Sequence, residues 1–190
     1  MSGMSIATKR GDDGTTDLLF GRRVAKSHPR VAACGAVDEL SASLGLARVF
    51  VRESRTRKAL PGIQHHLIGL MGELATHADD YEKYVEQGFA GVTGEMVDDL
   101  TKLVESFENE GELRFSGWAI PGESGLPGAA HLEMSRTICR RAEHCVALLR
   151  ELEPLPNPEI GRYLNRLADV LWLMARAEES AGDAGDRVSD

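Results

Sequence analysis

The chain has 190 residues, 42% of them hydrophobic, which is enough to bury the core of one globular domain. Its formal net charge of −8 argues against nucleic acid or an anionic membrane as the main partner. The three cysteines are widely spaced without a C-x-x-C, which favours a reducing compartment. No apolar leader opens the sequence and no apolar run approaches the ~18 residues of a membrane span. We therefore expect a soluble, cytoplasmic protein.

Residues 1–28 form a polar segment rich in glycine, threonine and charge. From Thr8 to Thr16 it reads T-K-R-G-D-D-G-T-T. Glycines let backbone amides approach a ligand closely, and threonine hydroxyls with successive amides can wrap an anion. Lys9, Arg10 and Lys26 can neutralise its charge. The segment is either a phosphate cradle or a flexible polar tail, and it has neither the Walker nor the G-x-G-x-x-G spacing.

Helical periodicity dominates residues 29–180, which we expect to form one bundle domain. Apolar residues at steps of three and four predict helices at about 29–51, 63–75, 93–111, 128–152 and 157–179. Pro61 and Gly62 are expected to break the chain before the second helix, and residues 79–94 to form a loop. Residues 181–190 are expected to be a disordered tail. The predicted fold is an all-α, ferritin-like, up-and-down bundle of five helices.

The two last helices carry long apolar stripes. In the fifth helix we expect a buried seam made of Ile160, Leu164, Leu167, Leu171 and Met174. In the fourth helix the residues expected to face inward are Met134, Ile138, Ala142, Cys145, Leu149 and Leu152.

The same two helices also carry polar stripes in their middles. On the fourth helix these are Glu133, Arg136, Arg140 and Glu143, with Arg141 alongside; on the fifth they are Arg162, Asn165, Arg166 and Asp169. A solvated, salt-bridged surface is one interpretation. The other is an anion site between neighbouring helices, because the guanidinium fork suits carboxylate and phosphate. Asp38, midway along the first helix, is a natural ion-pair partner for one of these arginines.

Metal chemistry by protein side chains finds no support in the sequence. His65 and His66 are adjacent and point to different faces of a helix, so they cannot act as joint ligands. The E-x-x-H pattern of di-iron bundles is absent. No serine or cysteine has a basic partner at motif spacing, so we expect no protein nucleophile.

Several separated segments together resemble the PduO-type ATP:cob(I)alamin adenosyltransferases. They are the Thr8–Thr16 stretch with G-R-R-V-A-K, then A-V-D-E-L-S-A-S-L-G, S-R-T-I-C-R-R-A-E-H and Y-L-N-R-L-A-D-V-L-W. The resemblance extends from Thr8 to about Arg176, and residues 53–114 share only the helical pattern.

The resemblance implies a homotrimer that binds ATP at its subunit interfaces, with Mg²⁺ on the triphosphate. The positions that resemble the family's ATP contacts are Thr8, Lys9, Arg10, Gly11, Thr16, Asp17, Lys26, Arg140, Arg141, Glu143 and Asn165. Asp38 and Arg136 resemble a salt-bridged pair at the subunit interface.

The implied reaction transfers the 5′-deoxyadenosyl group of ATP to reduced cob(I)alamin and releases triphosphate. Co(I) is the nucleophile, which agrees with the absence of a protein nucleophile in the sequence. The product would pass to an adenosylcobalamin-dependent enzyme. In the family an aromatic residue keeps the lower axial ligand away from cobalt.

Four positions depart from the family pattern. On the corrin side, Trp118 stands where Phe is usual and Glu133 where His is usual; elsewhere, Cys34 replaces Tyr and His144 replaces Arg. These departures leave open an alternative function, a trimer that binds ATP or adenosylcobalamin as a carrier or sensor with weak or no catalysis. A helical bundle with a purely structural role is the third hypothesis.

Overall fold

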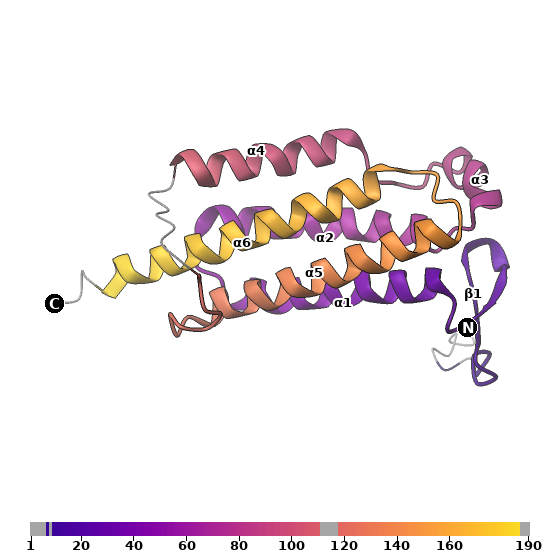
Figure 1. Ribbon diagram of the computed structural model, residues 1–190, viewed down its shortest axis with the longest axis horizontal. Coiled ribbons are helices and arrows are strands. Elements are labelled where there is room, and N and C mark those ends of the chain that lie inside the picture. Colours follow the sequence, from indigo (N-terminus) through magenta and orange to yellow (C-terminus); the bar gives the residue numbers. More distant parts are fainter. Residues whose placement is uncertain (1–6, 8, 111–117, 187–190) are drawn as a thin grey trace, which may run out of the picture.

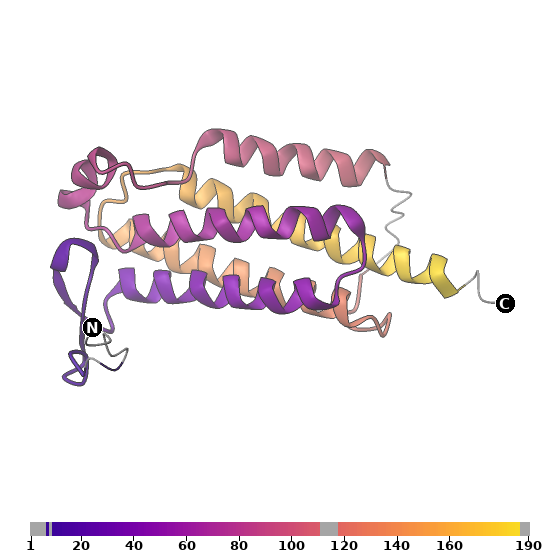
Figure 2. The ribbon, with the colours of Figure 1, turned by 180° about the vertical axis from the view of Figure 1, so that it is seen from behind.

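Five long helices run alternately up and down in a computed structural model that describes residues 7, 9–110 and 118–186 (Figures 1 and 2). They are α1 (Pro29–Phe50), α2 (Ser54–Leu74), α4 (Gly94–Glu110), α5 (Pro127–Leu152) and α6 (Glu159–Asp186). Helix α1 packs against α2 and α5, and α6 packs against α5 and α4. The predicted all-α, up-and-down bundle is confirmed, with one short helix added.

The apolar stripes of these helices meet in one continuous core. The seam predicted for α6 is fully buried, since its five residues from Ile160 to Met174 all have 0% exposure. Burying one such aliphatic side chain contributes about 1.5–3 kcal/mol. This seam is therefore a main source of the stability that fixes α6 against its neighbours.

The inward face predicted for α5 was wrong at two positions. Met134 and Leu152 are exposed, at 61% and 60%. Leu132, Cys139 and Val146 occupy the core instead. Helix α5 has apolar residues on more than one face, and only the packing of α1 and α6 selects the stripe that is buried.

The predicted break at Pro61 was also wrong, because α2 begins at Ser54 and continues through it. The Glu53 carboxylate caps the helix by accepting from the backbone N–H groups of Arg55 (3.1 Å) and Thr56 (2.7 Å). Leu60 and Ile63, on either side of the proline, are both buried. Core packing on this face outweighs the hydrogen bond that a helical proline removes.

The segment predicted as a loop at 79–94 contains a 3₁₀ turn, η2 (Ala78–Asp80), followed by a short helix, α3 (Tyr81–Glu86). The Tyr84 ring is buried, and its hydroxyl donates to the carbonyl of Ala90 at 2.6 Å. The buried Glu73 carboxylate accepts from the Tyr81 hydroxyl at 2.8 Å and the Val92 N–H at 2.7 Å. These contacts fix α3 to the end of α2.

The N-terminal segment forms an antiparallel hairpin of β1 (Thr15–Asp17) and β2 (Arg23–Ala25), with Thr16 opposite Val24. A 3₁₀ turn, η1 (Leu19–Gly21), closes it. The hairpin lies at the end of the bundle where α1 begins, close to α3 (Figures 1 and 2). The Leu19 N–H donates to the Ala75 carbonyl at 2.8 Å, which ties the hairpin to the end of α2.

Helix α6 continues to Asp186, beyond the position where the sequence predicts a tail to start. The prediction of a tail over 181–186 is therefore corrected, and residues 187–190 lie outside the described part of the chain. Apolar residues are too sparse after Glu179 for periodicity to reveal this last stretch of helix. None of the described helices has the length and apolar character that crossing a membrane requires.

Candidate functional site

The loop before β1 folds into successive tight turns. The Asp12 N–H donates to the carbonyl of Lys9 (3.3 Å) and the Gly14 N–H to that of Gly11 (3.2 Å). A Cβ added at Gly11 would lie 3.0 Å from Lys26 Nζ and 3.2 Å from the carbonyl oxygen of Thr15. The lysine could move aside, but the backbone oxygen could not. Glycine therefore allows the Lys26 ammonium to approach the loop backbone.

Ion pairs hold the basic side chains along the hairpin. Arg10 pairs with Asp17 at 3.1 Å, and Arg23 pairs with Asp17 and with Asp13, both at 3.3 Å. Hydrogen bonds from the hydroxyl (2.6 Å) and the N–H (3.0 Å) of Thr15 lower the pKa of Asp13. The hairpin thus presents an ordered arrangement of charges at one end of the bundle.

The predicted loop residues fall on this segment, with one outside the described part of the chain. Lys9, Arg10, Gly11, Thr16, Asp17 and Lys26 lie on the loop or hairpin. Thr8 is among the residues that the structure does not describe. Lys9 has a left-handed backbone (φ 58°), which is uncommon for a residue other than glycine.

A second group of predicted residues meets between α5 and α6. Arg140 Nη1 donates to Asn165 Oδ1 at 3.2 Å and pairs with Glu143 Oε2 at 2.6 Å. The structure thus brings these three of the four predicted side chains together. Arg141 turns the other way and forms an ion pair with Glu39 on α1. Whether these residues bind a ligand stays a prediction.

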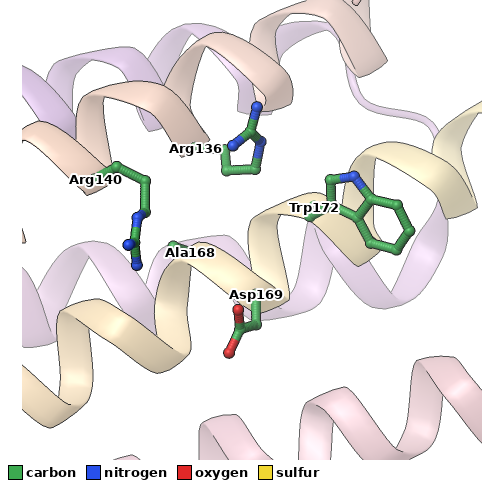
Figure 3. A pocket seen from close by; sticks show the side chains of 5 residues that line it. All are labelled: Arg136, Arg140, Ala168, Asp169 and Trp172. Carbon is green, nitrogen blue, oxygen red and sulfur yellow. The ribbon is translucent and has the colours of Figure 1, made fainter. Parts of the chain in front are cut away.

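A pocket of about 370 Å³ opens beside this group, lined by Arg136, Arg140, Ala168, Asp169 and Trp172 (Figure 3). The arginines come from α5 and the other three residues from α6. Sequence reasoning missed Trp172 as a lining residue. Helical spacing could have found it, because Asn165, Ala168 or Asp169, and Trp172 follow each other at steps of three and four.

Glu133, predicted on the corrin side, does not line this pocket and is buried with 3% exposure. Its Oε2 accepts from Arg136 Nε at 2.8 Å, and its Oε1 accepts from Arg176 Nη2 at 3.0 Å. Trp118, predicted on the same side, is 99% exposed in the single chain. The two predicted corrin-side residues are therefore not brought together.

A further pocket, of about 360 Å³, lies between the hairpin, α1 and α2. Its lining includes Thr16, Asp17, Cys34 and Asp38. Burial, together with the nearby Asp38 carboxylate, raises the pKa of the Cys34 thiol. Within one chain Arg136 pairs with Glu133 and not with Asp38. The predicted pairing of Asp38 with Arg136 between subunits stays a prediction.

Within one chain, the hairpin lies away from the group formed by Arg140, Glu143 and Asn165. The start of α1 is bound to the end of α5, because His28 (3.0 Å) and Arg30 (2.6 Å) both pair with Glu153. Arg140 lies twelve residues before Leu152, the last residue of α5, which is about 18 Å along the axis. The two groups of predicted residues thus lie at the end and in the middle of the bundle.

The described residues contain no group of three or more His, Cys, Asp or Glu side chains placed to hold a metal ion. The three cysteines are free thiols.

The fold and the two groups define an all-α bundle protein with a basic N-terminal hairpin and an arginine-lined pocket, both suited to anionic ligands. Residues 6–178 match the family model described as Cobalamin adenosyltransferase. The chain belongs to this family.

Among the curated relatives, a cobalamin adenosyltransferase of Cupriavidus metallidurans is 36% identical over 182 residues, which cover 95% of this chain and 91% of the relative. The corrinoid adenosyltransferase PduO of Salmonella typhimurium is 34% identical over 181 residues, which cover 93% of this chain. This chain spans only about half the length of that protein, at 50%.

Solved structures of PduO-type adenosyltransferases are also similar to this chain. One is a variant of the PduO-type ATP:corrinoid adenosyltransferase from Lactobacillus reuteri complexed with cobalamin and ATP. It is 29% identical to this chain with a TM-score of 0.82, and the match covers 94% of this chain and 93% of the other. Another variant of that enzyme, complexed with ATP, has a TM-score of 0.80 and covers 94% and 96%.

Proposed function

We propose that this protein transfers the 5′-deoxyadenosyl group of ATP to reduced cob(I)alamin. The Co(I) electron pair forms a bond to the 5′ carbon, the bond from that carbon to oxygen breaks, and triphosphate leaves with the bonding electrons. The observation that carries the proposal is the Arg140–Asn165 pair, found in a bundle similar to a solved adenosyltransferase complexed with cobalamin and ATP. Because cobalt is the nucleophile, the protein has to align the reactants and stabilise the leaving group.

The basic side chains are assigned to the nucleotide. Lys9, Arg10 and Lys26 on the loop would neutralise the triphosphate, and Gly11 would let backbone amides approach it. Arg140 would donate its guanidinium fork, oriented by Asn165. Thr16, Asp17 and Glu143 are assigned to the rim of the same site, and Mg²⁺ to the phosphate oxygens. Arg141 is assigned there too, and would have to leave its ion pair with Glu39 to reach the nucleotide. Trp118 is assigned to the corrin side.

We propose a homotrimer with the ATP site shared between subunits. Support comes from the separation of the hairpin from Arg140, about 18 Å along α5, which a second copy would bridge by bringing its hairpin to the pocket. Asp38, beside the hairpin, would then pair with Arg136 of the neighbouring subunit. Light scattering during gel filtration is expected to give the mass of three chains for the wild type. The Asp38→Ala trimer is expected to dissociate at a higher protein concentration than the wild-type trimer.

We place the protein in the cytoplasm, in keeping with its three free thiols. Its product is a cofactor, so the natural acceptor would be an adenosylcobalamin-dependent enzyme.

One assay tests the proposed activity. The protein is mixed with ATP, Mg²⁺ and chemically reduced cobalamin, and the corrin absorption spectrum is followed. The expected result is conversion of the Co(I) spectrum to that of a light-sensitive alkylcobalamin. ATP binding without formation of a Co–C bond would contradict the proposal.

That contrary result would favour the second candidate, a carrier or sensor that binds ATP or adenosylcobalamin. The observation behind this candidate is that Trp118 is 99% exposed and Glu133 is buried, so neither forms a corrin wall within one chain. A second assay that supplies Co(II) cobalamin with a mild reductant separates cobalt activation from adenosyl transfer. Loss of activity only under these conditions would locate the defect in cobalt activation.

A further inference from the structure

We propose that Glu133 is a positioning residue that holds Arg136 on the wall of the pocket between α5 and α6. This inference rests on the proposed adenosyl transfer for its kinetic consequences, whereas the positioning itself is testable without turnover. Glu133 is an unusual residue for a buried position in the second turn of α5, because an ionised carboxylate is costly to bury unless it is paired and hydrogen-bonded. Its surroundings supply that pairing from two helices.

Each oxygen of Glu133 serves a different arginine. Oε2 accepts from Arg136 Nε at 2.8 Å, one turn along α5, and Oε1 accepts from Arg176 Nη2 at 3.0 Å on α6. The Glu133 side chain is only 4% exposed and that of Arg176 only 9%, whereas Arg136 retains 30%. A single buried carboxylate therefore links the two helices that form the pocket.

The same cluster reaches both walls of the pocket. Arg136 lines it directly from α5. Arg176 lies 5.7 Å from the ring centroid of Trp172, which lines the opposite wall from α6 (Figure 3). Because Glu133 engages Arg136 through Nε, the orientation of the guanidinium plane is fixed from behind the pocket. Glu133 thus sets the position of Arg136 without touching whatever enters the pocket.

Replacing Glu133 by Gln separates this role from simple packing. Glutamine has the same shape but only one acceptor oxygen, and its NH₂ group is a donor. Its oxygen can therefore accept a hydrogen bond from one of the two arginines, but its NH₂ group would point at the N–H groups of the other arginine, with which it cannot form a hydrogen bond. Arg176 is too buried to turn to water, so Arg136 is the side chain expected to lose its contact with position 133, even where its Nη groups pair with Asp38 of a neighbouring subunit.

A matched control is available on α6. Glu179 also pairs with Arg176, at 2.9 Å, but the ion pairs of Arg136 do not include it. Glu179→Gln therefore perturbs the same arginine from the other side and leaves the Glu133–Arg136 contact in place. Its kcat is expected to stay within about twofold of wild type.

The first measurement needs no catalysis. Exchange of the Arg136 Nε–H with solvent, followed by ¹⁵N NMR, is expected to be slow in wild type and in Glu179→Gln, and fast in Glu133→Gln. Unchanged protection in Glu133→Gln would overturn the inference, even if the wild type formed no Co–C bond. Absence of that bond in the wild type would instead count against the proposed function.

The second measurement is kinetic. With pre-reduced cobalamin, Glu133→Gln is expected to lower kcat by ~10–100-fold through misplacement of Arg136. Its KM for ATP should change by less than about twofold, since the Arg140–Asn165 pair is retained. In an Arg136→Ala background, Glu133→Gln should cause no further loss, because both changes remove the same interaction. Additive losses would mean that Glu133 acts by another route.

Circular dichroism and a thermal melt check that each variant folds. Should Glu133→Gln fail this check, Arg136→Lys replaces it, because lysine cannot donate from the Nε position while Glu133 stays intact. The same loss of kcat is expected. A wild-type kcat for folded Arg136→Lys would overturn the inference.

Discussion

Arg140 is the residue on which the proposed nucleotide site depends most. It contacts Asn165 on α6 and Glu143 one turn along α5, so its guanidinium is oriented before any ligand arrives. A hydrogen bond to a charged group contributes about 1.5–3 kcal/mol. Arg140→Ala is therefore expected to weaken ATP binding ~10–100-fold by isothermal titration calorimetry.

Arg150→Ala is the matched control for that experiment, since Arg150 is an exposed residue near the end of the same helix. It should leave ATP affinity unchanged. If Arg140→Ala also binds ATP as wild type does, the nucleotide site is elsewhere.

Site residues differ in how far the sequence could reveal them. The meeting of Arg140 with Asn165 was predictable, because both lie on polar stripes of consecutive helices joined by a short connection. The burial of Glu133 was not, because its second partner, Arg176, is 43 positions away and on another helix. Glu178 is similar, as its buried carboxylate accepts from the backbone N–H groups of Arg52 and Glu53. The sequence shows that a helix contains an acidic residue, but only the packing of distant segments determines whether its carboxylate is buried against hydrogen-bond donors or exposed to water.

At the scale of elements, the hairpin and α3 form a unit that holds the basic loop. The Phe20 ring meets Phe89 edge to face at 6.4 Å, and Lys83 lies 4.3 Å from the Phe20 centroid. Arg22 adds ion pairs to Asp80 (3.0 Å) and Asp79 (3.5 Å). The turn η1 is thereby fixed to the bundle at its tip, and the loop before β1 is held through it.

Phe20 also has a left-handed backbone, with φ 66°, so its ring contacts must offset a conformational cost. Phe20→Ala keeps that cost and loses the ring contacts, worth about 1–2 kcal/mol together. Hydrogen exchange at the Leu19 N–H should accelerate, and ATP affinity should fall several-fold. Phe20→Gly should be milder than Phe20→Ala, because glycine adopts positive φ freely. Wild-type protection of Leu19 in Phe20→Ala would show that η1 is held by other contacts.

The elements that the sequence revealed are the long ones. Twenty-odd residues of apolar periodicity specify α1 or α5, whereas the six residues of α3 and the three-residue strands are too short to show a period. Pro61 misled the prediction of α2, because a local breaker was judged without the buried leucines that override it. Local signals thus predicted the bundle, and tertiary contacts determined the hairpin that completes it.

The molecule as a whole has a built-in pH dependence at the contact of α2 with α6. His66 Nδ1 lies 3.1 Å from the hydroxyl of buried Tyr163. Burial lowers the pKa of His66, and nearby Asp99 opposes this without reversing it. Below about pH 6.5, the unfolded chain therefore binds more protons than the folded one. The free energy of unfolding should therefore fall as the pH drops below about 6.5, and the contribution of neutral His66 should be fully present above that pH.

Urea unfolding at several pH values measures this effect. His66→Gln should flatten the decline below about pH 6.5, since it removes the titrating group. His65→Gln is the control, because the His65 ring is exposed and contributes less than burial to the lowered pKa of His66, so the decline should persist. An unaltered decline in His66→Gln would assign the pH dependence to other groups.

The distance between the hairpin and Arg140 has a consequence for mixtures of defective chains. A chain damaged in its loop, such as Lys26→Ala, still offers an intact pocket, and Arg140→Ala still offers an intact loop. If the protein forms the proposed trimer, each site shared between subunits would draw these halves from different chains, so about one site in four would receive two sound halves. Two inactive preparations, unfolded and refolded together, should regain up to about a quarter of wild-type activity by this complementation. No recovery would mean that each chain builds its own site.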